Sequence, residues 1–267
     1  MNAPACSKVM ANGANNFYKS DNVTVKKVTW KIKYILSAWL IAALACCPAY
    51  AEGSGPDAES PLVVLGMSPI SEKSYETFLP ILLEDAVKSR LEEGIISWDL
   101  FQPEDGKKDL LALERYKNRA AFEKHLEASY VKAFLEHIPA AVRDGEEQAA
   151  IFMKDLLPTA AKPIPSPQTT KNIISVLSVK QESVATVVKT LLDVAKAARS
   201  EDGNLVYDVF QDISDPRRLV VFQRWATPDA YDAHRGQASQ EKLNDLLEKS
   251  LTQPTREIWR AVRDIGR

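Results

Sequence analysis

The sequence contains one long stretch twice, offset by 109 residues. Segment 94–102, GIISWDLFQ, aligns with segment 203–211, GNLVYDVFQ, and the alignment continues downstream without a gap. The later matched pairs are identical or alike in chemistry: Leu110 and Leu219, Arg115 and Arg224, Tyr116 and Trp225, Ala121 and Ala230, His125 and His234. This period is too long for a solenoid repeat and suits a small domain duplicated whole. Each question about function therefore applies to two copies.

The N-terminus has the order of a secretory signal peptide. Four lysines between residues 26 and 33 precede the apolar run 34–45, and a small-x-small site, Ala49–Ala51, follows before polar residues. The apolar run is shorter than the roughly 20 residues of a spanning helix. We therefore expect cleavage after Ala51 and a periplasmic or secreted bacterial protein. An uncleaved anchor and lipidation at Cys46 are the alternatives, and only these would give the chain a membrane partner.

Composition excludes several kinds of site. The net charge of -2 and the absence of a basic patch give no reason to expect a nucleic-acid partner. All three cysteines, Cys6, Cys46 and Cys47, precede the predicted cleavage point, so the mature chain would have no thiol or disulfide. The sequence has no phosphate-binding glycine motif and no histidine or carboxylate cluster that suggests a metal.

Each copy is predicted to contain strand, helix, strand, strand, helix, helix and strand. This order gives a ferredoxin-like α+β domain, with an antiparallel sheet and helices on one face. Strands 95–100 and 219–222 are apolar on both faces, so each sheet needs cover beyond its own helices. We expect the two sheets to face each other and close into a barrel. We also expect Gly94 and Gly203 to end the first helix of each copy in the left-handed conformation.

The predicted domain boundaries follow from these patterns. They are a signal or targeting segment at 1–51, a linker at 52–60, a first domain at 61–157, a proline-rich linker at 158–171 and a second domain at 172–265.

These residues resemble the antibiotic biosynthesis monooxygenase family. The similarity rests on Gly94, Trp98–Phe101, Glu114–Tyr116 and Ala121–Phe134, and on their counterparts in the second copy. The resemblance implies a dimeric α+β barrel, made here from one polypeptide, with further homo-oligomerisation left open. It also implies a cofactor-independent monooxygenase that uses O2 on a small aromatic such as a quinol or polyphenol. Together with the predicted signal peptide, this leads us to expect an exported enzyme. A binding module for a small apolar ligand, without catalysis, is the alternative.

Haem binding or degradation is a third function found in the family. Haem-degrading relatives carry an asparagine at the end of the first strand and a haem-ligating histidine in the last helices. The corresponding positions here are Gly66–Ser68 and Leu177–Ser178, then Ala133–Phe134 and Lys242–Leu243. Neither signature is present, so haem binding or degradation is the least favoured of the three functions. We expect no cofactor.

His125 and His234 are the candidate catalytic residues. Helical spacing places each on an apolar helix face, where an imidazole could take the proton of a quinol. The alternative is a structural histidine with a satisfied hydrogen bond. Tyr116 and Trp225 end the third strand of each copy and are candidates to stack a substrate ring. Core packing is the alternative for them.

Four further residues complete the predicted substrate-binding set: Trp98, Tyr207, Arg115 and Arg224. Trp98 and Tyr207 are aromatic residues that could equally be core. Strand alternation places the arginines on the face opposite the neighbouring aromatics. There they could pair with Asp99 and Asp208 on the adjacent strand or stabilise an anion inside the barrel. Because the second copy loses the family's sequence after His234, we expect at most one working pocket.

Overall fold

The computed structural model describes residues 59–160, 162–254 and 259–267. The predicted signal segment, its cleavage site and the three cysteines lie outside these residues. Within the described part of the chain, no helix combines the length and apolar character needed to cross a membrane.

The observed elements follow the predicted order in both halves, which we define as the first half (61–157) and the second half (171–265). The first half contains β1 (Leu62–Pro69), α2 (Glu72–Ser89), β2 (Ile95–Pro103), β3 (Asp109–Tyr116), α3 (Arg119–Leu126), α4 (Ser129–Ala141) and β4 (Ala149–Asp155). The second contains β5 (Lys171–Ser178), α5 (Val184–Ala198), β6 (Asn204–Asp212), β7 (Arg218–Trp225), α6 (Pro228–Arg235), α7 (Ala238–Ser250) and β8 (Arg260–Asp264). Short 3-10 turns, Pro167–Thr169 and Gln181–Ser183, precede β5 and α5.

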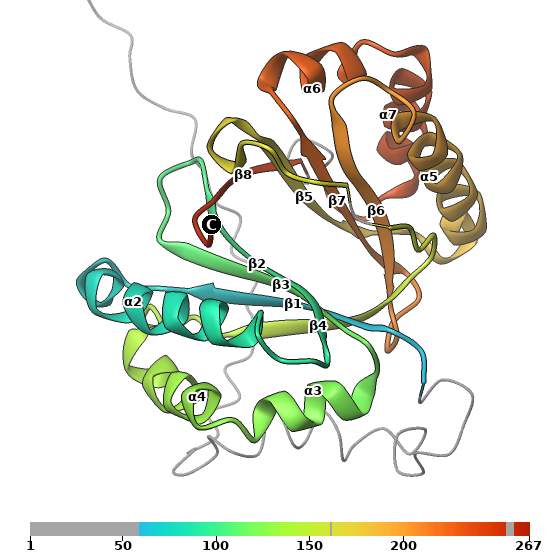
Figure 1. Cartoon of the computed structure of the whole chain (residues 1–267). Helices are drawn as coiled ribbons and strands as arrows, with labels where there is room; N and C mark the ends of the chain where they lie inside the picture. The colour runs from blue at the N-terminus through green and yellow to red at the C-terminus, as the bar shows by residue number, and fades with distance from the viewer. Residues whose placement is uncertain (1–58, 161, 255–258) are drawn as a thin grey trace, which may run out of the picture.

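The strands form one closed barrel in the order β1-β3-β2-β8-β5-β7-β6-β4. Each half contributes a four-stranded antiparallel sheet, and the halves join where β2 pairs with β8 and β4 pairs with β6. The helices of each half cover the outside of its own sheet (Figure 1). The prediction of two ferredoxin-like units closed into an intramolecular barrel is confirmed.

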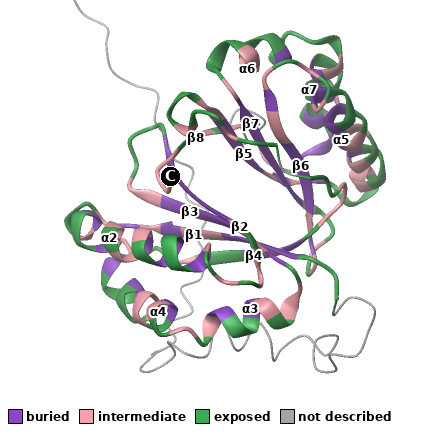
Figure 2. Cartoon of the chain, in the orientation of Figure 1, coloured by how far each residue is buried: buried purple, intermediate pink, exposed green. Residues whose placement is uncertain are grey.

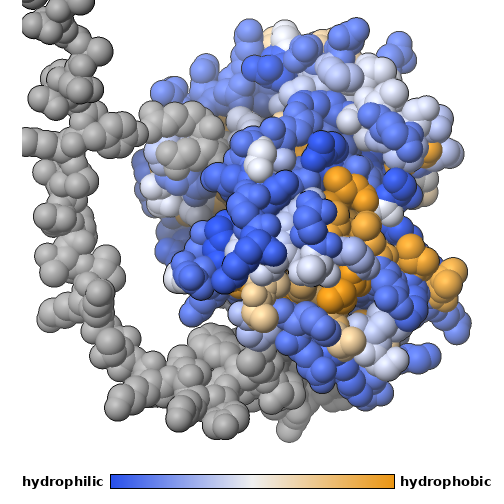
Figure 3. All heavy atoms as spheres, turned by 90° about the vertical axis from the view of Figure 1, so that its left-hand side faces the viewer, coloured by the Kyte–Doolittle hydropathy of each residue, from blue (hydrophilic) through white to orange (hydrophobic). Residues whose placement is uncertain are grey.

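The barrel interior is a packed apolar core. Alternate residues of each strand point inward, so one face of every strand supplies this core. Its buried members are Val63, Leu65, Phe101, Leu111, Leu113, Ile151, Met153, Ile174, Phe210, Val220, Phe222 and Val262. The strands are largely buried while the outer helix faces are exposed (Figure 2). The surface seen in Figure 3 is mostly hydrophilic, with one gathered apolar patch.

The opposite face of each sheet packs against its helices. In α5, Val187, Leu191, Val194 and Ala198 are buried at helical spacing against the second sheet. In α2, Tyr75, Phe78, Leu82 and Ala86 do the same in the first half, with Pro80 inside the helix. The space between sheet and helices is therefore where each half can hold either core side chains or a ligand.

The prediction that Gly94 and Gly203 end the first helix of each copy is wrong, because α2 already ends at Ser89 and α5 at Ala198. The expected left-handed conformation is found at Gly203, with a φ of 77°, and not at Gly94. Both glycines are instead sites of close approach, because a Cβ there would lie 2.6 Å from the Cβ of Ala121 or Ala230. Each glycine thus lets the turn after the first helix contact the helix that carries the candidate histidine.

Candidate functional site

The two candidate histidines lie on helices whose starts are fixed in the same way. The side chain of Asn118 accepts from the backbone N–H of Ala121 at the start of α3 (2.9 Å), and Thr227 accepts from Ala230 at the start of α6 (3.2 Å). These N-caps set where each helix begins and hence which side chains face the sheet. Both helices direct a histidine inward.

Each histidine contacts a glutamate from the turn that follows the first helix of its half. His125 Nδ1 lies 2.9 Å from Glu92 Oε1, and His234 Nδ1 lies 3.0 Å from Glu201 Oε2. Glu92 also accepts a hydrogen bond from the Tyr130 hydroxyl. Since the histidine–glutamate pair occurs in both halves, it ties the helix to the turn whatever the function of each half.

The second half contains a cavity of about 340 Å³ between β-sheet, α6 and α7. Its lining is rich in polar side chains and includes the candidate His234. The lining residues are Lys171, Ile173, Gln223, Tyr231, His234, Arg235, Gln240, Asn244, Trp259 and Ala261. This volume lies at the lower end of the roughly 300–1,000 Å³ of small-molecule sites, so it suits a compact ligand such as one substituted ring.

His234 forms the inner wall of this cavity and is only 1% exposed. Its ring stacks on Trp225, with centroids 4.6 Å apart, and meets the edge of Tyr207 at 5.7 Å. His234 Nε2 lies 3.1 Å from Gln240 Oε1, and the Gln240 amide continues to Asn244 Oδ1 at 3.0 Å. The imidazole is therefore fixed by Glu201 on one nitrogen and by a cavity-lining amide on the other.

The aromatic residues around His234 differ in their polar contacts. Trp225 Nε1 donates to Gln223 Oε1 at 3.1 Å. The Tyr207 hydroxyl is buried and has no hydrogen-bond partner among the described residues. Burial raises the pKa of Tyr207 well above its usual value, so this side chain stays a neutral phenol. It supplies shape and apolar surface to the site rather than a charge.

The corresponding space of the first half is filled. Phe152 occupies the position that Ala261 has in the second half, since each pairs with the equivalent residue of β1 or β5. The Phe152 ring packs edge-on against Phe122 with centroids 5.5 Å apart. Phe122 in turn packs on Tyr116 at 5.3 Å. His125 and Tyr116 are thus placed in a packed cluster rather than around a cavity.

The first half also contains a half-buried carboxyl group, that of Glu114. Glu114, the counterpart of Gln223, accepts a hydrogen bond from the Tyr116 hydroxyl. Desolvation raises the pKa of Glu114 to about 8, so the group is largely protonated at neutral pH. Trp98, the counterpart of Tyr207, lies in the core between α2 and the first sheet. Trp98, Tyr116 and His125 of the first half are therefore surrounded by packed core side chains.

Arg115 and Arg224 point into the barrel, on the face opposite Tyr116 and Trp225, as alternation predicts. Their predicted partners are corrected, however, because each pairs with the aspartate of the other half. Arg115 Nη2 lies 2.5 Å from Asp208, and Arg224 Nη2 lies 3.4 Å from Asp99 and 2.8 Å from Asp264. Register explains the change, since Arg115 faces Ser97 rather than Asp99 on β2. These arginines join the halves and do not reach the histidines.

A second cavity, of about 370 Å³, opens at this end of the barrel beside the linker residues 158–160. The charged residues that line it are largely paired with one another. Asp208 also forms an ion pair with Arg199 at 2.9 Å, and Asp99 forms one with Arg267 at 2.7 Å. A ligand there would have to displace these ion pairs. The cavity beside His234 is the better candidate site because, of these two cavities, it is the one lined by a candidate histidine.

Sequence reasoning missed most of the cavity lining. Gln240, Asn244, Lys171 and Arg235 have no counterpart of like chemistry in the first half, so the repeat gave no signal for them. The histidine partners could have been found, because Glu92 and Glu201 are identical residues at the repeat offset. Among the described residues, no three His, Cys, Asp or Glu side chains group as a metal site would require.

Several solved structures share this fold. A putative monooxygenase from Fusobacterium nucleatum is 14% identical and covers 77% of this chain and 93% of its own, with a TM-score of 0.69. One from Lactobacillus acidophilus is 16% identical with a TM-score of 0.62, covering 77% and 94%. An anthrone oxidase-like protein is 12% identical with a TM-score of 0.58, covering 77% and 92%. At these identities the similarity establishes the fold alone.

A sequence relative supports one domain only. An uncharacterised protein of Synechocystis is 30% identical over 82 residues, which cover 31% of this chain and 56% of that protein. The family model named antibiotic biosynthesis monooxygenase matches residues 61–137 and again residues 172–246. Because the two matches together span more than half of the sequence and one falls in each half of the barrel, the chain belongs to the antibiotic biosynthesis monooxygenase family.

Proposed function

We propose that the second half is a cofactor-independent monooxygenase site for a small aromatic such as a quinol or polyphenol. The observation that carries the proposal is the cavity of about 340 Å³ whose inner wall is His234, held between Glu201 and Gln240. Family membership supports monooxygenase-like chemistry, and the cavity suggests which half performs it. His125 has a structural role in this proposal.

In the proposed reaction, His234 acts as a general base. Gln240 Oε1 is an acceptor, so Nε2 carries a hydrogen in the unliganded site. When a ligand hydroxyl replaces the Gln240 amide, this hydrogen leaves to solvent and the hydroxyl donates its proton to the freed nitrogen. The Glu201 carboxylate at Nδ1 would stabilise the imidazolium that forms, as the aspartate carboxylate does in a Ser-His-Asp triad. Trp225 behind the imidazole and Tyr231 at the cavity wall hold the site in shape.

The deprotonated ring is electron-rich enough to reduce O2 directly. For a benzene-1,4-diol, one oxygen atom enters the ring and the other leaves as water, so quinol and O2 give hydroxyquinone and water. All four electrons come from the substrate. The protein supplies the base, the orientation and a site with little water.

Oxygen uptake by the purified protein tests this proposal. With chelator present and autoxidation subtracted, a panel of hydroquinones should give uptake that His234→Gln lowers by at least about a hundredfold, in line with loss of a general base. His125→Gln is the matched control, because the same pair with glutamate exists there without a cavity. Equal loss in both folded variants, or no uptake with any hydroquinone, would refute the assignment.

A non-catalytic binding module is the second candidate. It is favoured by one observation: both nitrogens of His234 already have polar partners, as expected of a structural histidine. Recovery of a bound aromatic unchanged after incubation with O2 would support this alternative.

We also propose that the protein is exported, on the strength of the basic, apolar and small-residue order before Glu52. N-terminal sequencing of the protein recovered from a periplasmic extract tests this. A first residue near Glu52 is expected, and an intact N-terminus in the cytosolic fraction would contradict it.

A further inference from the structure

The cavity of the second half has a cationic rim. Lys171 and Arg235 both line it, and none of its ten lining residues is a carboxylate. Gln223, Gln240 and Asn244 supply the remaining neutral polar groups. Each cation has a carboxylate partner outside this lining: Glu104 for Lys171 at 2.6 Å, and the exposed Asp232 for Arg235 at 3.5 Å.

The fold itself does not require this polarity. Comparison with the first half shows apolar residues at the equivalent positions, where the same space is packed. Leu62, Leu126, Val131 and Leu135 stand where the second half has Lys171, Arg235, Gln240 and Asn244. Because Leu62 and Val131 are buried there, an apolar lining is compatible with the same backbone. Of the four polar residues only Gln240 is buried, while Lys171 is half-buried and Arg235 and Asn244 are exposed. The two cations therefore stay hydrated at the cavity rim, where a ligand can reach them.

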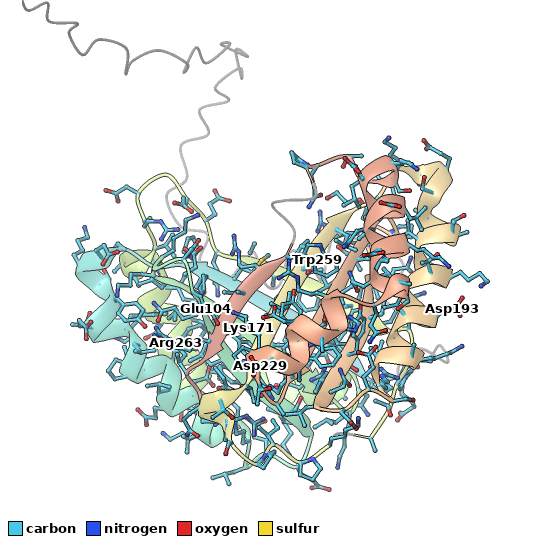
Figure 4. All side chains as sticks on the ribbon, turned by 90° about the horizontal axis from the view of Figure 1, so that it is seen from above. Glu104, Lys171, Asp193, Asp229, Trp259 and Arg263 are labelled. Carbon is cyan, nitrogen blue, oxygen red and sulfur yellow. The ribbon has the colours of Figure 1, made fainter. Side chains whose placement is uncertain are left out.

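The first half supplies a counter-ion at the cavity rim. Glu104 Oε2 lies 2.6 Å from Lys171 Nζ, and the Glu104 backbone N–H donates to the carbonyl of Ala261, a cavity-lining residue. Figure 4 shows Glu104 and Lys171 side by side, with Trp259 in the same region of the molecule. Both charged side chains are partly exposed, at 41% for Glu104 and 21% for Lys171. Such a pair is weak enough for an incoming anion to compete with Glu104.

We propose that the site selects aromatic ligands that carry a carboxylate, with Lys171 and Arg235 as the recognition residues and Glu104 as a displaceable counter-ion. This rests on the proposed function only for the location of the site. The ring would lie between Tyr231 and the His234 wall, and the carboxylate would face the rim. The Arg235 guanidinium lies 5.8 Å from the centre of the Tyr231 ring. Tyr231 could therefore contact the ring of such a ligand while the neighbouring Arg235 contacts its carboxylate.

The test uses two hydroquinones that differ only in charge, 2,5-dihydroxybenzoate and 2,5-dihydroxybenzamide. Binding to the purified full chain is measured calorimetrically without oxygen, and oxygen uptake is measured separately with both compounds. We expect the carboxylate to bind about fivefold more tightly than the amide, the upper range for a partly exposed ion pair. The preference should decrease as salt concentration rises.

Three variants examine the residues. Lys171→Gln with Arg235→Gln should reduce the preference to less than about twofold, whereas Glu104→Gln should increase it. Lys189→Gln is the matched control, because Lys189 pairs with Asp193 on the outer face of α5, far from the cavity (Figure 4). Equal binding of the two probes, or a preference that survives in the double variant, would overturn the inference.

The two proposals fail separately. Oxygen uptake with the amide but no preference for the carboxylate would refute the anion selectivity and leave the oxidation intact. A carboxylate preference that depends on Lys171, without oxygen uptake from either compound, would retain the recognition and refute the oxidation.

Discussion

Replacing Ala261 by phenylalanine should close the cavity of the second half. The first half shows that the backbone accepts this side chain, because Phe152 sits at the equivalent position of β4 and packs on Phe122. In the variant the new ring would meet Tyr231, the counterpart of Phe122, in the same way. The present cavity of about 340 Å³ is already near the lower limit of roughly 300 Å³ for small-molecule sites. A phenyl ring inside it therefore leaves no room for a substrate.

The expected result is loss of oxygen uptake and of calorimetric ligand binding by more than about tenfold, with thermal stability unchanged or raised. The reciprocal Phe152→Ala should destabilise the first half by about 3–5 kcal/mol, as measured by urea unfolding, and should leave binding in the second half unaltered. Ala150→Phe, on the exposed part of β4, controls for added bulk. Full binding and uptake in a folded Ala261→Phe variant would show that the ligand uses another site.

Three further outcomes follow from the packing. Because the pKa of Glu114 rises to about 8 on folding, the folded chain keeps a proton that the unfolded chain loses above about pH 4.5, and stability should fall by up to about 1.4 kcal/mol per pH unit between these values. Glu114→Gln should remove that slope in urea unfolding measured from pH 5 to 8, and parallel curves would contradict it. Arg224→Met should cost about 3–5 kcal/mol in the same assay by leaving the buried carboxylates of Asp99 and Asp264 with only the partly exposed Arg267 as an ion-pair partner among the described residues, and a loss below about 1 kcal/mol would contradict it. Gly203→Ala should lower the melting temperature more than Gly106→Ala: both have positive φ, but only a Cβ at Gly203 would lie 2.6 Å from the Cβ of Ala230, so equal shifts would contradict this.

The repeat made the architecture predictable. Apolar periodicity in each copy gave the order of strands and helices, and strands apolar on both faces indicated a second sheet as cover. The inward direction of His125 and His234 also followed from helical spacing, and both are buried, at 4% and 1% exposure. These features depend on local pattern, which the sequence displays directly.

Partners that lie far apart in the sequence were harder to predict. Arg115 was expected beside Asp99 and instead pairs with Asp208, because the barrel brings together inward-facing residues of different halves. The pairing depends on the relative register of strands and on how the halves join, and neither can be read from alternation within one strand.

The sequence alone determined that this protein is a duplicated α+β domain with a histidine and an aromatic residue at matching places in each copy. It could not determine which copy keeps a cavity. One position that contributes to that difference lies on the last strand, Phe152 in one half and Ala261 in the other, and its side chain reaches the helix only after the sheet has formed. Whether a space is filled depends on the summed volume of side chains from distant elements, and only the tertiary structure brings those side chains together.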